Sequence, residues 1–220
     1  MTEQSFDTQG FETMRRAMVS SQLRTTAVND PRVVAAMAAV PRERYVPADR
    51  AAIAYADFAV PLGDGRLLNP PMVTGRMLTE LHPLPTDHAL VIGAATGYAA
   101  AVLARLVASV VALDTDDRIV ASVSADPIAN VERAAGPLAA GWSAGAPYDL
   151  ILIDGAIESV PAAIVAQLAE GGRLAAAIVE GGVSRLSIGR RAGDAFGMTA
   201  FADADAVSLP GFAAPPAFKF

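Results

Sequence analysis

Glycines and an acid near the middle of the chain have the types and spacing of a site for the adenosine end of a cofactor. Gly93 and Gly97 follow the apolar run HALVI (residues 88–92), and Asp114 ends a second apolar run. A glycine after a strand allows a tight turn, and an acid about twenty residues further on can accept hydrogen bonds from ribose hydroxyls. The candidate cofactor-binding residues are therefore Gly93, Ala95, Gly97 and Asp114.

The spacing of the glycines favours one class of cofactor over another. A nicotinamide dinucleotide is typically held by G-x-G-x-x-G, whose backbone amides reach the pyrophosphate. Here the turn reads GAATG, which is G-x-x-x-G with no third glycine. This spacing fits S-adenosylmethionine, a ligand without phosphates, better. The alternative is a turn that opens a helix, followed by an acid at a strand end, with no ligand bound.

The chain has no cysteine and only two histidines, His82 and His88. Disulfides, thiolate metal sites and a cysteine nucleophile are thereby excluded. Both histidines lie in one segment with the composition of a linker, so neither a histidine metal site nor a Ser-His-Asp triad is expected. No metal site is predicted.

The elements that must position the candidate residues follow from the second part of the chain, residues 83–220. Strands are expected at residues 88–92, 109–113, 130–134, 148–154, 173–179, 184–191 and 198–209, with helices at 97–106 and 160–170. Alternating strands and helices predict a mostly parallel, doubly wound sheet. Ligands of such sheets bind beyond the carboxyl ends of the strands, so Gly93–Gly97, Asp114 and Asp154 should surround one crevice.

The first part, residues 1–82, has a different pattern. Helices are expected at residues 10–24, 32–40 and 72–81, and a turn at residues 63–65. Asp30 followed by Pro31 is typical of a helix start. We expect these residues to form a helical cap that covers the substrate and cofactor site of the core, in one compact structural unit.

Composition sets further limits. A chain of 220 residues with 53% hydrophobic content can form one well-cored domain. Its net charge is −6 and it has no basic run, so nucleic-acid binding is not expected. No apolar stretch approaches the roughly 20 residues of a membrane span, and the polar start MTEQSFDTQG does not read as a signal peptide. A cytoplasmic protein without membrane contact is the expectation.

Several blocks of sequence carry a resemblance to a known family. They are MVSSQLR, DPRVVAAMAAVPRERYVP, AYADFAVPLGDGRLLNPPMVTGRML, VIGAATGYAAAVLARL, PYDLILIDGA and VPAAIVAQLAEGGRL. In this order and spacing they resemble the protein-L-isoaspartate O-methyltransferases over nearly the whole chain. The resemblance implies a Rossmann-like methyltransferase fold, with a mainly parallel seven-stranded sheet and an N-terminal helical cap.

The resemblance also implies the reaction. The family transfers a methyl group from S-adenosylmethionine to the α-carboxylate of L-isoaspartyl residues, and its partners are damaged proteins or peptides that contain them. A carboxylate is already ionised near pH 7, so the enzyme needs orientation more than a strong base. The scarcity of histidine and cysteine is therefore compatible with this chemistry.

The chain departs from the family at the cofactor crevice. The family turn reads E-I-G-T-G-S-G-Y, so Val91 replaces an acid and Ala95 a glycine. The family T-I-S becomes Leu67-Leu68-Asn69, which makes Asn69 the candidate catalytic residue in place of a serine. Where a G-D-G is expected after the third strand, the chain has AGP at residues 135–137. Losing three polar contacts of about 1 kcal/mol each would weaken cofactor binding on the order of a hundredfold.

These departures leave alternatives open. Asn69 can instead be an N-cap for the helix that follows Pro70. The chain as a whole is a working isoaspartyl methyltransferase, a catalytically weak or silent relative that serves as a binding protein, or a methyltransferase for another small acidic or hydroxyl substrate.

Overall fold

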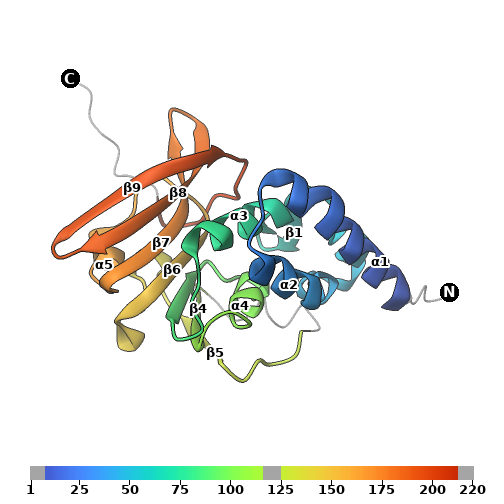
Figure 1. Ribbon diagram of the computed structural model, residues 1–220, viewed down its shortest axis with the longest axis horizontal. Coiled ribbons are helices and arrows are strands. Elements are labelled where there is room, and N and C mark those ends of the chain that lie inside the picture. Colours follow the sequence, from blue (N-terminus) through green and yellow to red (C-terminus); the bar gives the residue numbers. More distant parts are fainter. Residues whose placement is uncertain (1–7, 116–124, 213–220) are drawn as a thin grey trace.

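Seven strands form one sheet in the order β5-β4-β3-β6-β7-β8-β9 in the computed structural model of the chain (Figure 1). The strands are β3 (His88–Ile92), β4 (Ser109–Asp114), β5 (Val131–Ala135), β6 (Tyr148–Ile157), β7 (Leu168–Glu180), β8 (Val183–Ala192) and β9 (Ala195–Asp203). The first five strands in this order, β5, β4, β3, β6 and β7, are parallel to one another. Strand β8 is antiparallel to β7, and β9 is antiparallel to β8. The predicted seven-stranded, mainly parallel sheet is confirmed.

The structure describes residues 8–115 and 125–212. Its helices are α1 (Thr8–Met18), α2 (Pro31–Ala39), α3 (Pro71–Leu81), α4 (Tyr98–Leu103) and α5 (Ala162–Val165). A π-helical turn (Val19–Leu23) continues α1, and 3-10 turns follow at Arg42–Tyr45 and Ala48–Ile53. In Figure 1, α3 and α4 lie between the sheet and the N-terminal helices α1 and α2. No helix in the described ranges has the length and apolar character needed to cross a membrane.

The central strands form because both of their faces are buried. On β3, Ala89 and Val91 join the hydrophobic cluster shared with the N-terminal helices, while Leu90 and Ile92 join the cluster on the opposite face. A parallel strand covered on both sides needs such a continuous apolar run. The first cluster contains residues from both sides of position 82, so the cap and the core are packed on one another.

Two helix starts were predicted from local sequence, with different outcomes. Asp30 caps α2, because its side chain accepts a hydrogen bond from the Arg32 amide at 2.8 Å. The capping role considered for Asn69 is wrong. Helix α3 begins after Pro70 without any side-chain cap, and the Asn69 side chain is bonded to β6 instead.

The helix predicted at residues 160–170 is reduced to the single turn α5. Strand β7 already begins at Leu168, which pairs with Tyr148 of β6. Just before it, the Gln167 carbonyl accepts a hydrogen bond from the Tyr148 amide at 2.8 Å. Pairing with the sheet has overridden the helical pattern of the sequence, as tertiary context commonly does.

The last predicted strand, residues 198–209, is also too long. Strand β9 ends at Asp203, and the following segment returns to β6, where the Ala156 amide donates to the Val207 carbonyl at 2.7 Å. His88 was grouped with the linker histidines although it begins the strand predicted at residues 88–92, and it opens β3. Its ring nitrogens contact Ser109 Oγ at 2.6 Å and the Gly145 carbonyl at 3.0 Å. It is therefore a structural histidine.

A separate two-stranded hairpin precedes α3. It consists of β1 (Val60–Gly63) and β2 (Arg66–Leu68). The predicted turn is present, and its residues Gly63, Asp64 and Gly65 have φ values of 101°, 49° and 73°. Two glycines suit this left-handed conformation because they have no Cβ. The hairpin brings Arg66 and Asn69 to the carboxyl ends of the central strands.

Candidate active site

The carboxyl ends of β3, β4 and β6 meet at one edge of the sheet. Ile92 of β3 is in register with Leu113 of β4 and with Ile153 of β6. The next residue of each strand is a candidate site residue, so Gly93 lies between Asp114 and Asp154. The predicted convergence of these residues, which are far apart in the sequence, is thereby confirmed, and all three are buried.

The turn after β3 keeps a conformation suited to glycine, even at an alanine. Gly93, Ala95 and Gly97 have φ values of 78°, 48° and 100°. An L-residue in the left-handed region is disfavoured by roughly 1–2 kcal/mol. Ala95 is held there by its surroundings, because its amide donates to Asp114 Oδ2 at 2.6 Å. The turn therefore has a left-handed backbone at Ala95 as well as at the two glycines.

Protein groups cover this turn, and all of its residues from 93 to 97 are buried. A Cβ at Gly93 would lie 2.7 Å from Leu209 Cδ2, and one at Gly97 would lie 2.6 Å from Arg133 Nη2. The same Arg133 nitrogen donates to the Thr96 carbonyl at 3.0 Å. Close approach at both glycines is thus to side chains of the chain itself.

Asp114, the candidate ribose partner, is paired with Arg66 of the hairpin. Arg66 Nη1 contacts Asp114 Oδ1, and Nη2 donates to Oδ2 at 2.8 Å. The side chains are 13% and 6% exposed, so this bidentate pair is largely withdrawn from water. Such fork-to-carboxylate pairs are among the stronger polar contacts in proteins.

Asn69, the candidate catalytic residue, joins three segments. Its Nδ2 donates to the carbonyl and to the Oδ1 carboxylate oxygen of Asp154, both at 2.9 Å. Its Oδ1 accepts from the Val207 amide at 2.9 Å. The side chain is buried, and both of its amide hydrogens are engaged. Through these hydrogen bonds Asn69, just before α3, links the start of that helix to β6 and to the segment that contains Val207.

Asp154 is a buried acid at the same place. Burial raises the pKa of its carboxyl above the ordinary value of 3.8, and the hydrogen bond from Asn69 and the charge of Arg42 counteract this only in part. The Thr74 hydroxyl lies 3.4 Å from Asp154 Oδ1. Desolvation of the charged form therefore dominates here.

Arg42, the first residue of the 3-10 turn Arg42–Tyr45, is fully buried. Its Nε donates to the Ala54 carbonyl at 2.6 Å and its Nη2 to the Asn69 carbonyl at 2.5 Å. Its guanidinium lies 4.6 Å from the centre of the Tyr98 ring, a cation–π contact. Within the described part of the chain, Arg42 Nη1 and the Tyr98 hydroxyl have no hydrogen-bond partner. Desolvation lowers the pKa of Arg42.

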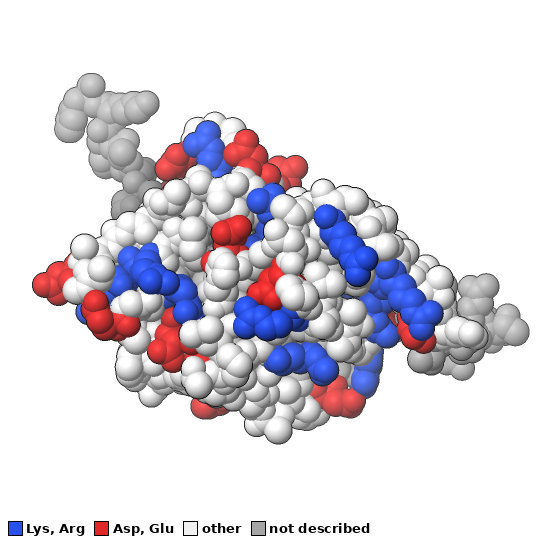
Figure 2. Space-filling view, viewed as in Figure 1, with Lys and Arg blue, Asp and Glu red and all other residues white. Residues whose placement is uncertain are grey.

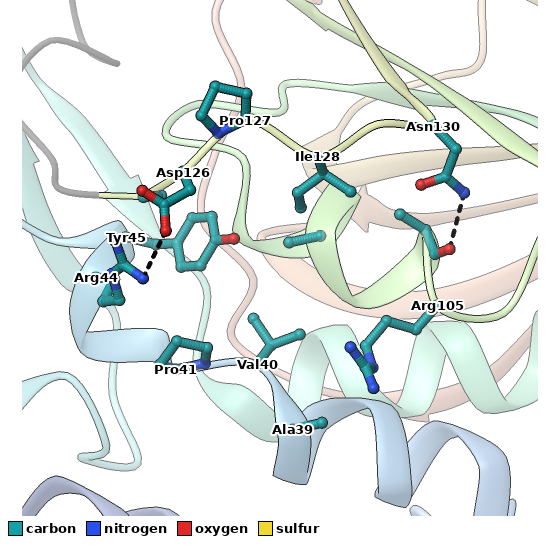
Figure 3. Close-up of a pocket in the computed structure, with 13 residues that line it drawn as sticks. Ala39, Val40, Pro41, Arg44, Tyr45, Arg105, Asp126, Pro127, Ile128 and Asn130 are labelled. Atoms are coloured by element: carbon teal, nitrogen blue, oxygen red, sulfur yellow. Dashed lines mark hydrogen bonds and ion pairs between the residues drawn. The ribbon is translucent and has the colours of Figure 1, made fainter. Parts of the chain in front are cut away.

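A hollow of about 470 Å³ lies away from these residues, between the ends of α2 and α4 and the segment 125–130 (Figure 3). Arg44 pairs with Asp126 at 2.9 Å on one side, and Arg105 stands on the other. A smaller hollow beside it reaches Gly97 and Arg133. The larger one is lined by none of the candidate residues, whereas the smaller one borders the turn after β3 through Gly97.

Neither surface charge nor metal-binding side chains mark a further site. Acidic and basic side chains are interspersed over most of the face shown in Figure 2. Within residues 8–115 and 125–212, no group of three His, Asp or Glu side chains is arranged to hold a metal ion.

Sequence reasoning missed three groups that shape the crevice: Arg42, Arg66 and the Val207 amide. Arg42 and Arg44 stand two residues apart in one PRER segment, yet the first is fully buried and the second is partly exposed. Arg66 follows the predicted turn, which indicates a hairpin but not the partner of its guanidinium. For Val207 there was no signal, because a backbone amide is present at every residue except proline.

Comparison with known proteins gives a consistent picture. The family model for protein-L-isoaspartate(D-aspartate) O-methyltransferase (PCMT) matches residues 13–207. A protein-L-isoaspartate O-methyltransferase of Methanoregula boonei is 41% identical over 164 residues, which cover 73% of this chain and 76% of that relative. One from Methylorubrum populi is 37% identical over 186 residues, covering 83% of this chain and 88% of the relative.

A similar fold is found in a solved structure from Plasmodium falciparum. That chain is described as a protein-L-isoaspartate O-methyltransferase in complex with S-adenosyl-L-homocysteine. It superposes with a TM-score of 0.76 at 19% identity, covering 90% of this chain and 98% of its own. At this identity the likeness supports the fold alone.

Proposed function

This chain belongs to the protein-L-isoaspartate O-methyltransferase family, and we propose that it methylates the α-carboxylate of L-isoaspartyl residues in damaged proteins. The observation that supports the proposal is the convergence of the candidate residues. Asp114, the turn at residues 93–97 and the Asn69–Asp154 pair meet at one sheet edge. Ligands of open α/β sheets bind at this edge.

The residues of the crevice fit an adenosyl cofactor. Asp114 faces two guanidinium N–H donors of Arg66, and a ribose would offer two hydroxyl donors in their place. Asp114 would hold the ribose, and Gly93, Ala95 and Gly97 would form the turn beside it. S-adenosylmethionine, when bound, supplies a methyl group on a positively charged sulfur.

The chain's own part in the reaction is mainly orientation. The substrate carboxylate is ionised near neutral pH, so no side chain has to remove a proton from it. Asn69 fixes the start of α3 to the end of β6, and Arg42 holds the Asn69 carbonyl from the other side. We infer that Asn69 acts as a positioning residue, which keeps the walls of the crevice at a constant distance. Accurate placement of reacting groups accounts for much of such catalysis.

The test is the transfer of labelled methyl groups from S-adenosylmethionine to an isoaspartyl peptide and to its normal aspartyl counterpart. We expect weak transfer to the first and none to the second. Asp114→Ala should abolish transfer and remove binding of S-adenosylhomocysteine, because hydrogen bonds to a charged group contribute about 1.5–3 kcal/mol. Equal labelling of both peptides would contradict the proposed substrate.

A second function is favoured by the closed state of the crevice. Asp114 is paired, the turn is buried, and the side chain of Asn69 is fully engaged. These contacts suit a catalytically silent relative that serves as a binding protein. Calorimetric titration with S-adenosylhomocysteine separates the two, since a silent relative with a closed crevice would release or absorb no heat of binding.

A further inference from the structure

Asp114 has no acceptor capacity left for a ribose while Arg66 is in place. Besides the two nitrogens of Arg66, it accepts from the Ala95 amide at 2.6 Å, the Thr115 amide at 2.7 Å and the Thr115 hydroxyl at 3.2 Å. A carboxylate offers about four lone-pair positions, and five donors already surround this one. A ribose can therefore bind Asp114 only by replacing one of them.

Among these donors, only Arg66 contacts both carboxylate oxygens, so a ribose that binds both of them has to replace it. The Ala95 amide reaches Oδ2 alone, and the amide and hydroxyl of the exposed Thr115, which follows β4, reach Oδ1 alone. Arg66 comes from β2, which pairs with β1 in a two-stranded sheet of its own. A Cβ at Gly63 or Gly65 of the connecting turn would meet nothing within 4 Å, so the tip of the hairpin stands in open space.

Arg66 and a ribose offer Asp114 the same number of hydrogen-bond donors. The planar guanidinium presents two N–H donors to the two carboxylate oxygens, and the ribose presents two neighbouring hydroxyl donors. Both kinds of donor satisfy the same acceptor, so Asp114 keeps its hydrogen bonds in either state. The released guanidinium returns to water, where it is well solvated.

We propose that Arg66 is a competitor built into the cofactor site. Paired with Asp114 it closes the ribose position, and the site binds cofactor only in molecules where the pair has opened. This inference rests on the proposed function, since it concerns the affinity for the same cofactor. A site that is open in about one molecule in ten shows an apparent affinity about tenfold weaker than that of the open form.

The experiment is a calorimetric titration of the full chain with S-adenosylhomocysteine. Arg66→Ala removes the competitor and should lower the dissociation constant about tenfold. Arg66→Gln, which keeps a polar side chain without the charge, should lower it by less. Arg185→Ala is the matched control: it removes the same charge from an exposed pair on β8 and should leave the dissociation constant unchanged.

A double variant tests whether the effect passes through Asp114. In an Asp114→Ala background, Arg66→Ala should not restore binding of S-adenosylhomocysteine, because there is no acceptor left to free, and restored binding would contradict the competitor. Thermal unfolding without ligand establishes that each variant is folded. Should Arg66→Ala fail to fold, Arg66→Gln carries the test.

The outcomes separate this inference from the proposed function. Tighter binding by Arg66→Ala than by wild type, or binding by the variant alone, supports the competitor. If wild type binds and Arg66→Ala binds equally or more weakly, the competitor is overturned and the proposed cofactor stands. If folded wild type and both Arg66 variants all fail to bind, the cofactor assignment falls, and the competitor falls with it.

Discussion

Two arginine–aspartate pairs stand at opposite ends of the sheet and differ in what holds them. Arg66 pairs with Asp114 at the carboxyl end of β4, and Arg173 pairs with Asp87 just before the amino end of β3. Their burial is nearly the same, with exposed fractions of 13% and 6% against 15% and 5%. Solvent access therefore does not distinguish them, although Arg66 is bidentate to Asp114 whereas Arg173 contacts Asp87 through Nη2 alone.

A further difference lies in the elements that carry the arginines. Arg173 lies within β7 and is paired on both sides, with Leu150 of β6 and Arg190 of β8. Arg66 lies on a three-residue strand of a separate hairpin. We expect the Arg66 pair to open more readily than the Arg173 pair, because the backbone that carries Arg173 is held by a strand on each side.

The largest expected difference is in stability. Among the described residues, Arg173→Ala leaves the buried Asp87 carboxylate with the Leu84 amide as its remaining donor, at 2.8 Å. Arg66→Ala leaves Asp114 with three donors, from Ala95 and Thr115. Breaking one partner of a buried pair costs about 3–5 kcal/mol, and we expect Arg173→Ala to lower the free energy of unfolding by about 3 kcal/mol. Arg66→Ala should cost about 1 kcal/mol.

Urea unfolding of both variants measures this difference, with Arg185→Ala as the exposed reference. Cofactor affinity should change only in Arg66→Ala. Equal losses of stability in the two buried variants would show that anchorage does not matter and would break the comparison.

The second prediction concerns the other crevice acid, Asp154, and its pH dependence. Its pKa is raised in the folded state by burial, from an ordinary value of 3.8. Between 3.8 and the raised value, the folded protein binds more protons than the unfolded chain. The contribution of Asp154 to stability is therefore most favourable at low pH and is lost as pH rises through this window. For one proton the slope cannot exceed about 1.4 kcal/mol per pH unit.

Asp154→Asn removes the titrating group and should flatten this part of the stability profile. The measurement is the free energy of unfolding of wild type and variant at several pH values from 4 to 8, and the difference between the two curves isolates Asp154. Asp203→Asn, at an exposed acid, is the control. Parallel curves for wild type and Asp154→Asn would mean that burial does not perturb this acid.

The smallest expected effect concerns the turn beside Asp114. Ala95→Gly relieves a left-handed alanine worth roughly 1–2 kcal/mol, but a glycine loses about 0.5–1 kcal/mol more backbone entropy on folding. The net change should lie within about 1 kcal/mol and favour the variant. Ala94→Gly is the matched control, because its φ is not positive and only the entropic cost applies. Thermal unfolding should rank Ala95→Gly above Ala94→Gly, and the reverse order would mean that the left-handed alanine is not strained.

Much of the fold and the location of the crevice were predictable from sequence because local patterns determine them. The run at residues 88–92 became β3 with the predicted bounds, the Gly-Asp-Gly turn formed, and Asp30 capped α2. Parallel strands end at the same edge of a sheet, so Gly93, Asp114 and Asp154 had to converge once the strands were identified. Their convergence needed no knowledge of individual contacts.

Only the tertiary structure decided the partners of the polar side chains. Arg66 meets an acid 48 residues away, and Asn69 meets one 85 residues away. Sequence does not show which of Arg42 and Arg44 is buried, nor that residues 168–170 leave a helical pattern to join β7. A hydrogen-bonding group accepts any suitable partner within about 3 Å. Which partner it finds depends on how elements that are distant in the sequence pack together. This packing is fixed only when the core forms.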